Sequence, residues 1–282
     1  MSIYGMLRTA VSGMAAQANK LSAVGDNVAN ASTTGYKKAM TEFSTQTLPS
    51  KPSNYNSGGV STATRYAISQ QGGLSFTTSD YDMAISGNGF FVVSKGVATG
   101  APPVRSFDSA AGAELVLTRA GSFQVTAEGY LINAAGYYLL GASDAATNVN
   151  NLSNFNDNPI QLTDDQMSAE SVSVEDGKIS FVHSDATISS IQLWLANVKS
   201  PDSLEPDTGT TYKLNPKAGA ININNPTSAG FGEVVGSALE QSTVDLAGEL
   251  ASMIEAQRGY SSNTKTFQTA DEVLQEVLNL KR

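Results

Sequence analysis

Apolar residues recur every seven positions at both ends of this chain and at alternate positions in between. Near the N-terminus, two rows have this spacing, with an offset of four between them. The rows are Ile3, Ala10, Gln17 and Val24, and Leu7, Met14, Leu21 and Val28. The spacing predicts a helix over residues 1–30 with one apolar seam.

The C-terminal region, residues 243–282, has the same period and predicts a second, longer helix. We expect the two helices to pair as a coiled-coil stalk. Each contains interior glycines that cost about 1 kcal/mol relative to alanine, and charges are scarce in the first helix. An ordinary helical pair on a globular core is the common alternative, but these features favour partners from other subunits. The predicted assembly residues are Ile3, Leu7, Met14, Leu21, Val24, Val28, Leu246, Leu250, Met253, Tyr260, Phe267, Leu274 and Leu278.

The middle of the chain alternates apolar and polar residues in short runs separated by turn residues, which predicts β-hairpins. We expect an extended connector over 31–75, a β-rich, barrel-like domain over 76–142 and 171–242, and a surface excursion over 143–170. One continuous alternating run is expected over 188–198. The predicted fold class is α+β, with a mainly β centre and helices at both ends.

The composition argues against nucleic-acid and membrane partners. The chain carries 15% charged residues, a formal net charge of −9 and a pI near 4.6. Phosphates and anionic membranes both require clustered Lys and Arg. No cysteine is present, which excludes disulfides and thiolate metal sites. The sequence predicts neither a cleavable signal peptide nor membrane insertion.

Residues that could carry out catalysis or bind a metal are few. The single histidine, His183, cannot form a His-rich metal site. Gly87-Asn88-Gly89 lacks the Gly-Lys-Ser/Thr of a phosphate-binding loop, so hairpin turns explain it better. Asp157, Asp164 and Asp165 fit no EF-hand spacing. We predict no catalytic, cofactor-binding or metal-binding residues and no cofactor; an enzyme and a secreted Ca²⁺-binding adhesin are the remote alternatives.

The end of the first helix carries a distinctive string, Gly25-Asp26-Asn27-Val28-Ala29-Asn30-Ala31-Ser32-Thr33-Thr34-Gly35-Tyr36-Lys37. Asn30 competes for backbone hydrogen bonds and Gly35 permits a left-handed turn, so the residues alone indicate a helix end. The string also resembles the Asn-x-x-Asn-x-x-Thr-x-Gly-[Tyr/Phe]-Lys signature of the bacterial flagellar rod and hook family. The motif residues are Asn27, Asn30, Thr34, Gly35, Tyr36 and Lys37.

Other stretches resemble the same family over about residues 1–142 and 171–282. They are Met83-Ala84-Ile85-Ser86-Gly87-Asn88-Gly89-Phe90-Phe91, Leu117-Thr118-Arg119-Ala120-Gly121-Ser122-Phe123, Met253-Ile254-Glu255-Ala256-Gln257-Arg258-Gly259-Tyr260 and Lys265-Thr266-Phe267-Gln268-Thr269-Ala270-Asp271-Glu272. The opening Ser2-Ile3-Tyr4-Gly5-Met6 and Gly230-Phe231-Gly232 look like the hook branch. Hook proteins usually insert a large outer domain where this chain has only 143–170, so its length is closer to a distal rod protein.

The resemblance implies a non-enzymatic subunit of the flagellar hook, or alternatively of the distal rod. Such subunits leave the cell through the flagellar type III export apparatus and polymerise into a hollow tube outside it. The hook version is flexible and transmits torque as a universal joint, whereas the rod is a rigid drive shaft. The implied partners are many copies of the same chain, the rod, the hook cap, the hook–filament junction proteins and the export apparatus.

Overall fold

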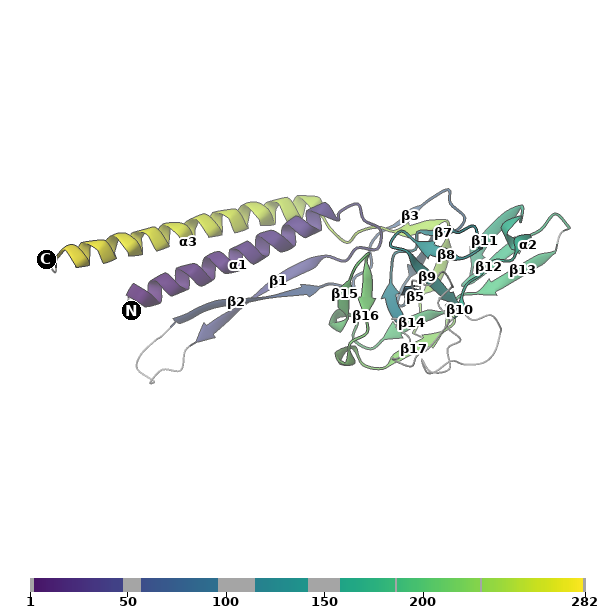
Figure 1. The fold of residues 1–282 in the computed structure, drawn as a ribbon, viewed down its shortest axis with the longest axis horizontal. Coiled ribbons are helices and arrows are strands. Elements are labelled where there is room, and N and C mark those ends of the chain that lie inside the picture. The colour runs from purple at the N-terminus through teal and green to yellow at the C-terminus, as the bar shows by residue number, and fades with distance from the viewer. Residues whose placement is uncertain are drawn as a thin grey trace. The chain divides into compact units, whose positions relative to one another are not determined.

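The computed structural model describes residues 3–47, 57–95, 115–141, 158–185, 187–228 and 230–280 (Figure 1). The chain divides into two compact units. Unit 1 comprises residues 1–31, 38–67 and 244–282, and unit 2 comprises residues 32–37 and 68–243. Each unit is therefore built from segments that lie far apart in the sequence.

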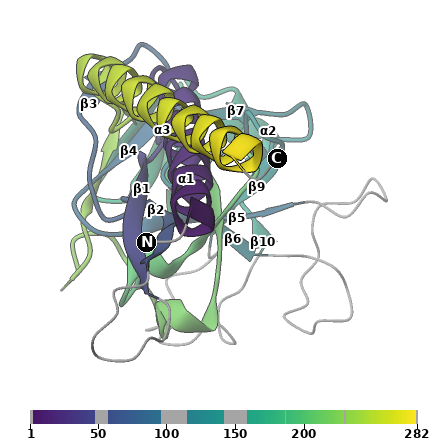
Figure 2. The same cartoon turned by 90° about the vertical axis from the view of Figure 1, so that its left-hand side faces the viewer.

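Unit 1 contains two long helices, α1 (Ile3–Ala29) and α3 (Leu246–Leu280), which run antiparallel along one another (Figures 1 and 2). Asp245 caps α3, since its carboxylate accepts hydrogen bonds from the backbone N–H groups of Ala247 and Gly248 at 3.2 and 3.3 Å. The helix continues without a break through Gly259, because the intervening residues are mostly good helix formers.

A two-stranded ribbon, β1 (Ala39–Thr47) with β2 (Ser57–Tyr66), completes unit 1 and packs on α1. Helix α1 thus lies between the ribbon and α3 (Figures 1 and 2). Ser12 accepts a hydrogen bond from the Val60 N–H at 3.3 Å, and Asn19 donates one to the Thr62 hydroxyl at 2.7 Å. The ribbon occupies much of the span expected to be an extended connector. Its Thr- and Ser-rich strands supply the β-branched residues that favour pairing.

The largest sheet lies in unit 2 and follows the strand order β15-β16-β6-β5-β9-β8-β7, with β10 beside β9 and β14 joining β5 to β17. The strands are β5 (Phe90–Lys95), β6 (Leu115–Thr118), β7 (Phe123–Val125), β8 (Leu131–Asn133), β9 (Tyr137–Gly141), β10 (Asn158–Pro159), β14 (Leu195–Val198), β15 (Glu205–Asp207), β16 (Thr211–Lys213) and β17 (Ile221–Asn224). Every pairing is antiparallel. Over the described residues the sheet does not close into the barrel that the sequence suggested.

Smaller elements surround this sheet. They are the three-stranded sheet β11 (Ser171–Glu175), β12 (Lys178–Val182) and β13 (Ile188–Gln192), the pairs β4 (Met83–Ser86) with β18 (Glu233–Gly236) and β3 (Leu74–Phe76) with β19 (Ala238–Glu240), helix α2 (Asp164–Met167), and the 3₁₀ turns Pro201–Ser203 and Pro216–Ala218. The core of unit 2 joins both kinds of sheet, because Phe91, Phe123 and Phe181 belong to one apolar cluster.

The α+β class, with a mainly β centre and terminal helices, is confirmed. The run over 188–198 is not one strand: β13 and β14 belong to different sheets. Consecutive Leu193 and Trp194 are both buried, which ends the alternation between them. In the excursion expected over 143–170, residues 143–157 lie outside the described residues. Ile160 and Leu162 follow β10 and enter the core, because both side chains are large and apolar.

Candidate assembly surface and the polar network around the motif

The contact between α1 and α3 is built largely from small residues. Ala256 and Ala270 on α3 are buried, and a Cβ added at Gly13 of α1 would lie 2.8 Å from the side chain of Asn263. A Cβ added at Gly259 would lie 3.0 Å from the side chain of Gln17. The glycine that weakens α3 as an isolated helix therefore permits close approach to α1. A small-residue contact brings helix backbones together but buries little apolar area.

The predicted seam on α1 fits this contact only partly. Val24 is buried, whereas Leu7, Met14, Leu21 and Val28 are half-buried. The side chain of Ile3 lies outside the described residues. One ion pair crosses between the helices, from the Lys20 ammonium to Glu255 at 2.7 Å.

On α3 the buried row differs from the predicted residues. It holds Glu249, Ala256 and Ala270, which lie three residues after Leu246, Met253 and Phe267 respectively. Of the predicted α3 residues, Met253 and Leu274 are half-buried and the rest are exposed. The predicted residues and the buried row both have heptad spacing. The alanines of the buried row let the two helices approach more closely than large side chains would. Leu250 and Leu278 are exposed and lie outside this buried row.

This difference leaves apolar side chains uncovered along one side of α3. We call this set the α3 stripe; it comprises Leu246, Leu250, Ile254, Tyr260, Phe267 and Leu278, exposed by 49%, 52%, 52%, 42%, 38% and 65%. Tyr4 and Val11 on α1 are also exposed, by 78% and 48%. Exposed apolar surface of this extent is typical of protein–protein contact sites.

The motif at the end of α1 contributes to unit 1 through Asn27. Its buried side-chain amide donates to the Ala39 carbonyl and accepts from the Ala39 N–H, both at 2.8 Å, and donates to Glu249 at 3.1 Å. Lys38 forms an ion pair with Glu249 at 2.5 Å. These contacts join the end of α1, the start of β1 and the first turn of α3.

The rest of the motif ends the helix and enters unit 2. Asn30 donates from its side chain to the Asp26 carbonyl at 2.9 Å, which is a helix-end contact. Gly35 has φ +68°, and a Cβ there would lie 2.6 Å from the backbone nitrogen of Ala120. Glycine is therefore required twice, by backbone conformation and by close packing. Thr34 and its neighbour Thr33 both line a cavity of about 210 Å³. By its spacing from Asn27 and Asn30, Thr33 is the threonine that matches the signature.

Lys37 lies at the centre of a buried charge network in unit 2. Its ammonium pairs with the Glu240 carboxylate at 2.5 Å and also donates to the Gln70 carbonyl. The same carboxylate accepts from the Gly72 N–H at 2.8 Å and from the Arg119 guanidinium at 3.3 Å. The side chains of Lys37 and Glu240 are 0% exposed. The network therefore ties the end of the motif to residues just before α3.

Burial and charge act against each other on the two cations. Burial lowers the pKa of Lys37, while the Glu240 carboxylate opposes that shift. Burial also lowers the pKa of Arg119, again opposed by Glu240. Arg119 is held further by the Gly87 carbonyl at 2.8 Å and by the ring of Phe90, whose centroid lies 5.0 Å from the guanidinium carbon.

Sequence reasoning missed Glu240 and Glu249 altogether. Neither belongs to a recognisable motif, and an acidic residue is most often solvated. The adjacent Lys37 and Lys38 were a weak indication that buried carboxylates lie nearby. Buried lysines require carboxylates, but the sequence does not say which ones.

The described residues bring together no group of three His, Asp or Glu side chains that could hold a metal ion. His183 shares a hydrogen bond with the Ser189 hydroxyl at 3.0 Å. Asp164 and Asp165 form the first turn of α2, and Asp157 lies outside the described residues. Within the described part of the chain, no helix is long and apolar enough to cross a membrane.

Comparisons with known families match both ends of the chain. Residues 7–37 match the model described as flagella basal body rod protein, and residues 235–280 match the C-terminal model of the flagellar basal body rod FlgEFG proteins. The first match includes Asn27 and Lys37, and the second includes Glu249 and Glu240. The two polar networks thus each join one matched region to the other.

Whole-chain relatives come from two kinds of flagellar protein. The chain is 32% identical to flagellar hook protein FlgE of Rhizobium meliloti over 421 residues, with 100% of both chains covered. It is 32% identical to FlgE of Brucella abortus over 411 residues, again with 100% of both covered. It is 30% identical to flagellar basal-body rod protein FlgG of Bacillus subtilis over 296 residues, covering 98% of this chain and 100% of the relative.

Proposed function

The chain belongs to the bacterial flagellar rod and hook family, and we propose that within this family it acts as a hook subunit. It is a structural subunit of the flagellar axis and not an enzyme, and its place is the bacterial flagellum. Family membership removes the enzyme alternative raised by the sequence.

The observation that carries the hook proposal is the match to hook proteins from end to end, at 32% identity. A hook protein of Caulobacter vibrioides adds support, at 44% identity over 143 residues. The rod remains the alternative, because the alignments with rod proteins need only 296 and 291 positions for this chain of 282 residues. The hook alignments need 421 and 411 positions, so those relatives carry segments that this chain lacks.

As part of the same proposal, the chain leaves the cell by the flagellar type III route and polymerises into a hollow tube that transmits torque. Its partners would be other copies, the rod, the hook cap and the hook–filament junction proteins. The α3 stripe supports this proposal, because its apolar side chains remain exposed in the described part of a single copy. Neighbouring copies that cover the α3 stripe would supply the missing burial.

Electron microscopy of the self-assembled full-length protein tests the hook proposal. Curved, flexible tubes are expected for a hook subunit, whereas straight, rigid tubes would favour the rod. A protein that stays monomeric at high concentration would contradict both. In the monomer, we expect faster hydrogen exchange at the amides of α1 and α3 than at those of unit 2; amides as well protected there as in unit 2 would contradict stabilisation of these helices by assembly.

Substitutions on the helices test the assembly surface. We expect Phe267→Asp, on the α3 stripe, and Leu21→Asp, on α1, to abolish polymers while unit 2 stays folded. A carboxylate in an apolar contact must be desolvated without a partner. Thr269→Asp is the matched control, because it introduces the same charge two residues away from Phe267, outside the stripe. Normal polymers from Phe267→Asp would refute the assignment.

A further inference from the structure

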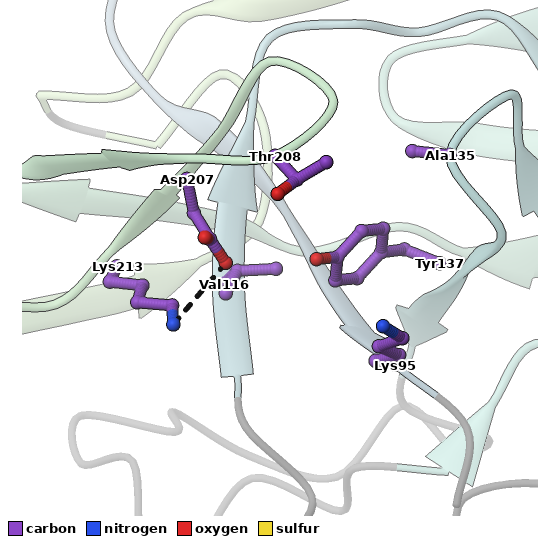
Figure 3. A pocket seen from close by; sticks show the side chains of 7 residues that line it. All are labelled: Lys95, Val116, Ala135, Tyr137, Asp207, Thr208 and Lys213. Carbon is purple, nitrogen blue, oxygen red and sulfur yellow. Dashed lines mark ion pairs between the residues drawn. The ribbon is translucent and has the colours of Figure 1, made fainter. Parts of the chain in front are cut away.

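Unit 2 contains an open pocket that neither the motif nor the helices account for. Its volume is about 340 Å³, and it lies between β5, β6, β9 and the β15–β16 turn (Figure 3). The lining residues are Lys95, Val116, Ala135, Tyr137, Asp207, Thr208 and Lys213. Figure 3 shows Lys95 and Lys213 on either side, with the Tyr137 hydroxyl and the Thr208 side chain directed between them.

The charges of the lining favour an anionic occupant. Two ammonium groups face one carboxylate, and Asp207 pairs with Lys213 at 3.4 Å. Lys95 has no carboxylate partner among the described residues. Tyr137 and Thr208 add hydroxyl groups that can donate hydrogen bonds. The volume is at the lower end for ligand pockets, which suits a side-chain carboxylate better than a large cofactor.

Helix α2 and strand β13 lie at the other end of unit 2 from β15 and β16 (Figure 1). Asp164, Asp165 and Asp185 are exposed there and pair with no cation among the described residues. We call these three residues the acidic end. Hydrogen bonds hold the segments that carry these aspartates together. Gln166, next to Asp165, donates to the Ser189 hydroxyl at 3.4 Å, and His183, two residues before Asp185, shares a hydrogen bond with the same hydroxyl. Ile188, at the start of β13 beside the acidic end, is 69% exposed, which is unusual for a large apolar side chain.

We propose that the Lys95 pocket of one copy binds carboxylates of the acidic end of a second copy. This inference rests on polymerisation, which is a property of the family, and not on the choice between hook and rod. Donor and acceptor lie at opposite ends of the same unit, so the contact is head-to-tail and repeats along a polymer. In a chain of net charge −9, such a contact also relieves repulsion between neighbours.

Reversing the charge of the pocket is the first test. Lys95→Glu should raise the critical concentration for assembly of the full-length protein about tenfold, since like charges then meet at the contact. Lys217→Glu, at an exposed lysine outside the pocket, is the matched control and should change little. Unfolding followed by the fluorescence of Trp194, which lies in unit 2, verifies that both variants fold.

Mixing two variants identifies the occupant. Asp165→Lys with Asp185→Lys reverses the acidic end and should also impair assembly by itself. An equimolar mixture with Lys95→Glu should assemble, because each copy then meets an oppositely charged neighbour at every such contact. The shape of the tubes is read separately, so an error in the hook assignment leaves this test intact.

Three outcomes would overturn the proposal. The first is normal assembly of Lys95→Glu, and the second is a mixture that assembles no better than its components. The third is saturable binding of inorganic phosphate to the monomer that depends on Lys95, together with unchanged assembly of the variants. That last result would assign the pocket to a small free anion.

Discussion

Neutralising Glu240 is the sharpest test of the network that the motif enters. In Glu240→Gln the side chain keeps its size but loses its charge. Lys37 and Arg119 would then remain in the interior of unit 2 without an anion among the described residues. Arg119 cannot release its proton, so its charge stays buried. Lys37 can, and we expect its pKa to fall further, because only Glu240 opposes the effect of burial.

The size of the effect follows from the burial of the network. The side chains of Lys37, Arg119 and Glu240 are exposed by 0%, 5% and 0%, so solvent screens these charges little. Removing one partner of a buried ion pair costs about 3–5 kcal/mol. A domain has only about 5–15 kcal/mol of stability, so the loss should be plainly measurable.

Urea unfolding followed by Trp194 fluorescence is the assay, because the only tryptophan is buried in unit 2. We expect a lower midpoint with an unchanged slope. Glu233→Gln, at an exposed position on β18, is the matched control and should lose less than about 0.5 kcal/mol. A loss below about 1 kcal/mol in Glu240→Gln would refute the view that this carboxylate neutralises two buried cations.

Further predictions concern the motif and the helix pair. Gly35→Ala should destabilise unit 2 by several kcal/mol, because the position has positive φ and the added Cβ would overlap a neighbouring backbone. Gly136→Ala is the control, since this position has positive φ but lies in open space, and it should lose only about 1–2 kcal/mol. Equal losses of stability in urea unfolding would contradict the packing argument. Asn27→Ala should lower the stability of unit 1 by about 1–3 kcal/mol, measured by circular dichroism at 222 nm, since it leaves buried backbone groups unpaired. The hydrogen bond from Lys20 lowers the pKa of Glu255. The pair therefore stabilises the folded state above the pKa that Glu255 has when unfolded, and this stabilisation is lost as pH falls through its folded pKa. An NMR titration of Glu255 that does not change in Lys20→Gln would contradict this cause.

Periodicity predicted the elements whose pattern is local. The hairpins expected over 76–142 correspond to strands such as β8 and β9, and the helix expected over 243–282 corresponds to α3. Predictions failed where burial depended on distant partners. Ile160 and Leu162 follow a polar, irregular stretch, yet they reach the core because β10 pairs with β9.

The family, the two long helices and the low-charge composition can be read from the amino-acid sequence, because each depends on local spacing and residue type. Which row of α3 faces α1 is known only from the folded protein. Heptad spacing is shared by both rows, and the choice depends on how closely Gly259 and Ala256 let the helices approach. In the folded protein the adjacent Lys37 and Lys38 also pair with different carboxylates, Glu240 and Glu249. Burial of a charge is decided by the partner it meets, and that partner lies some two hundred residues away.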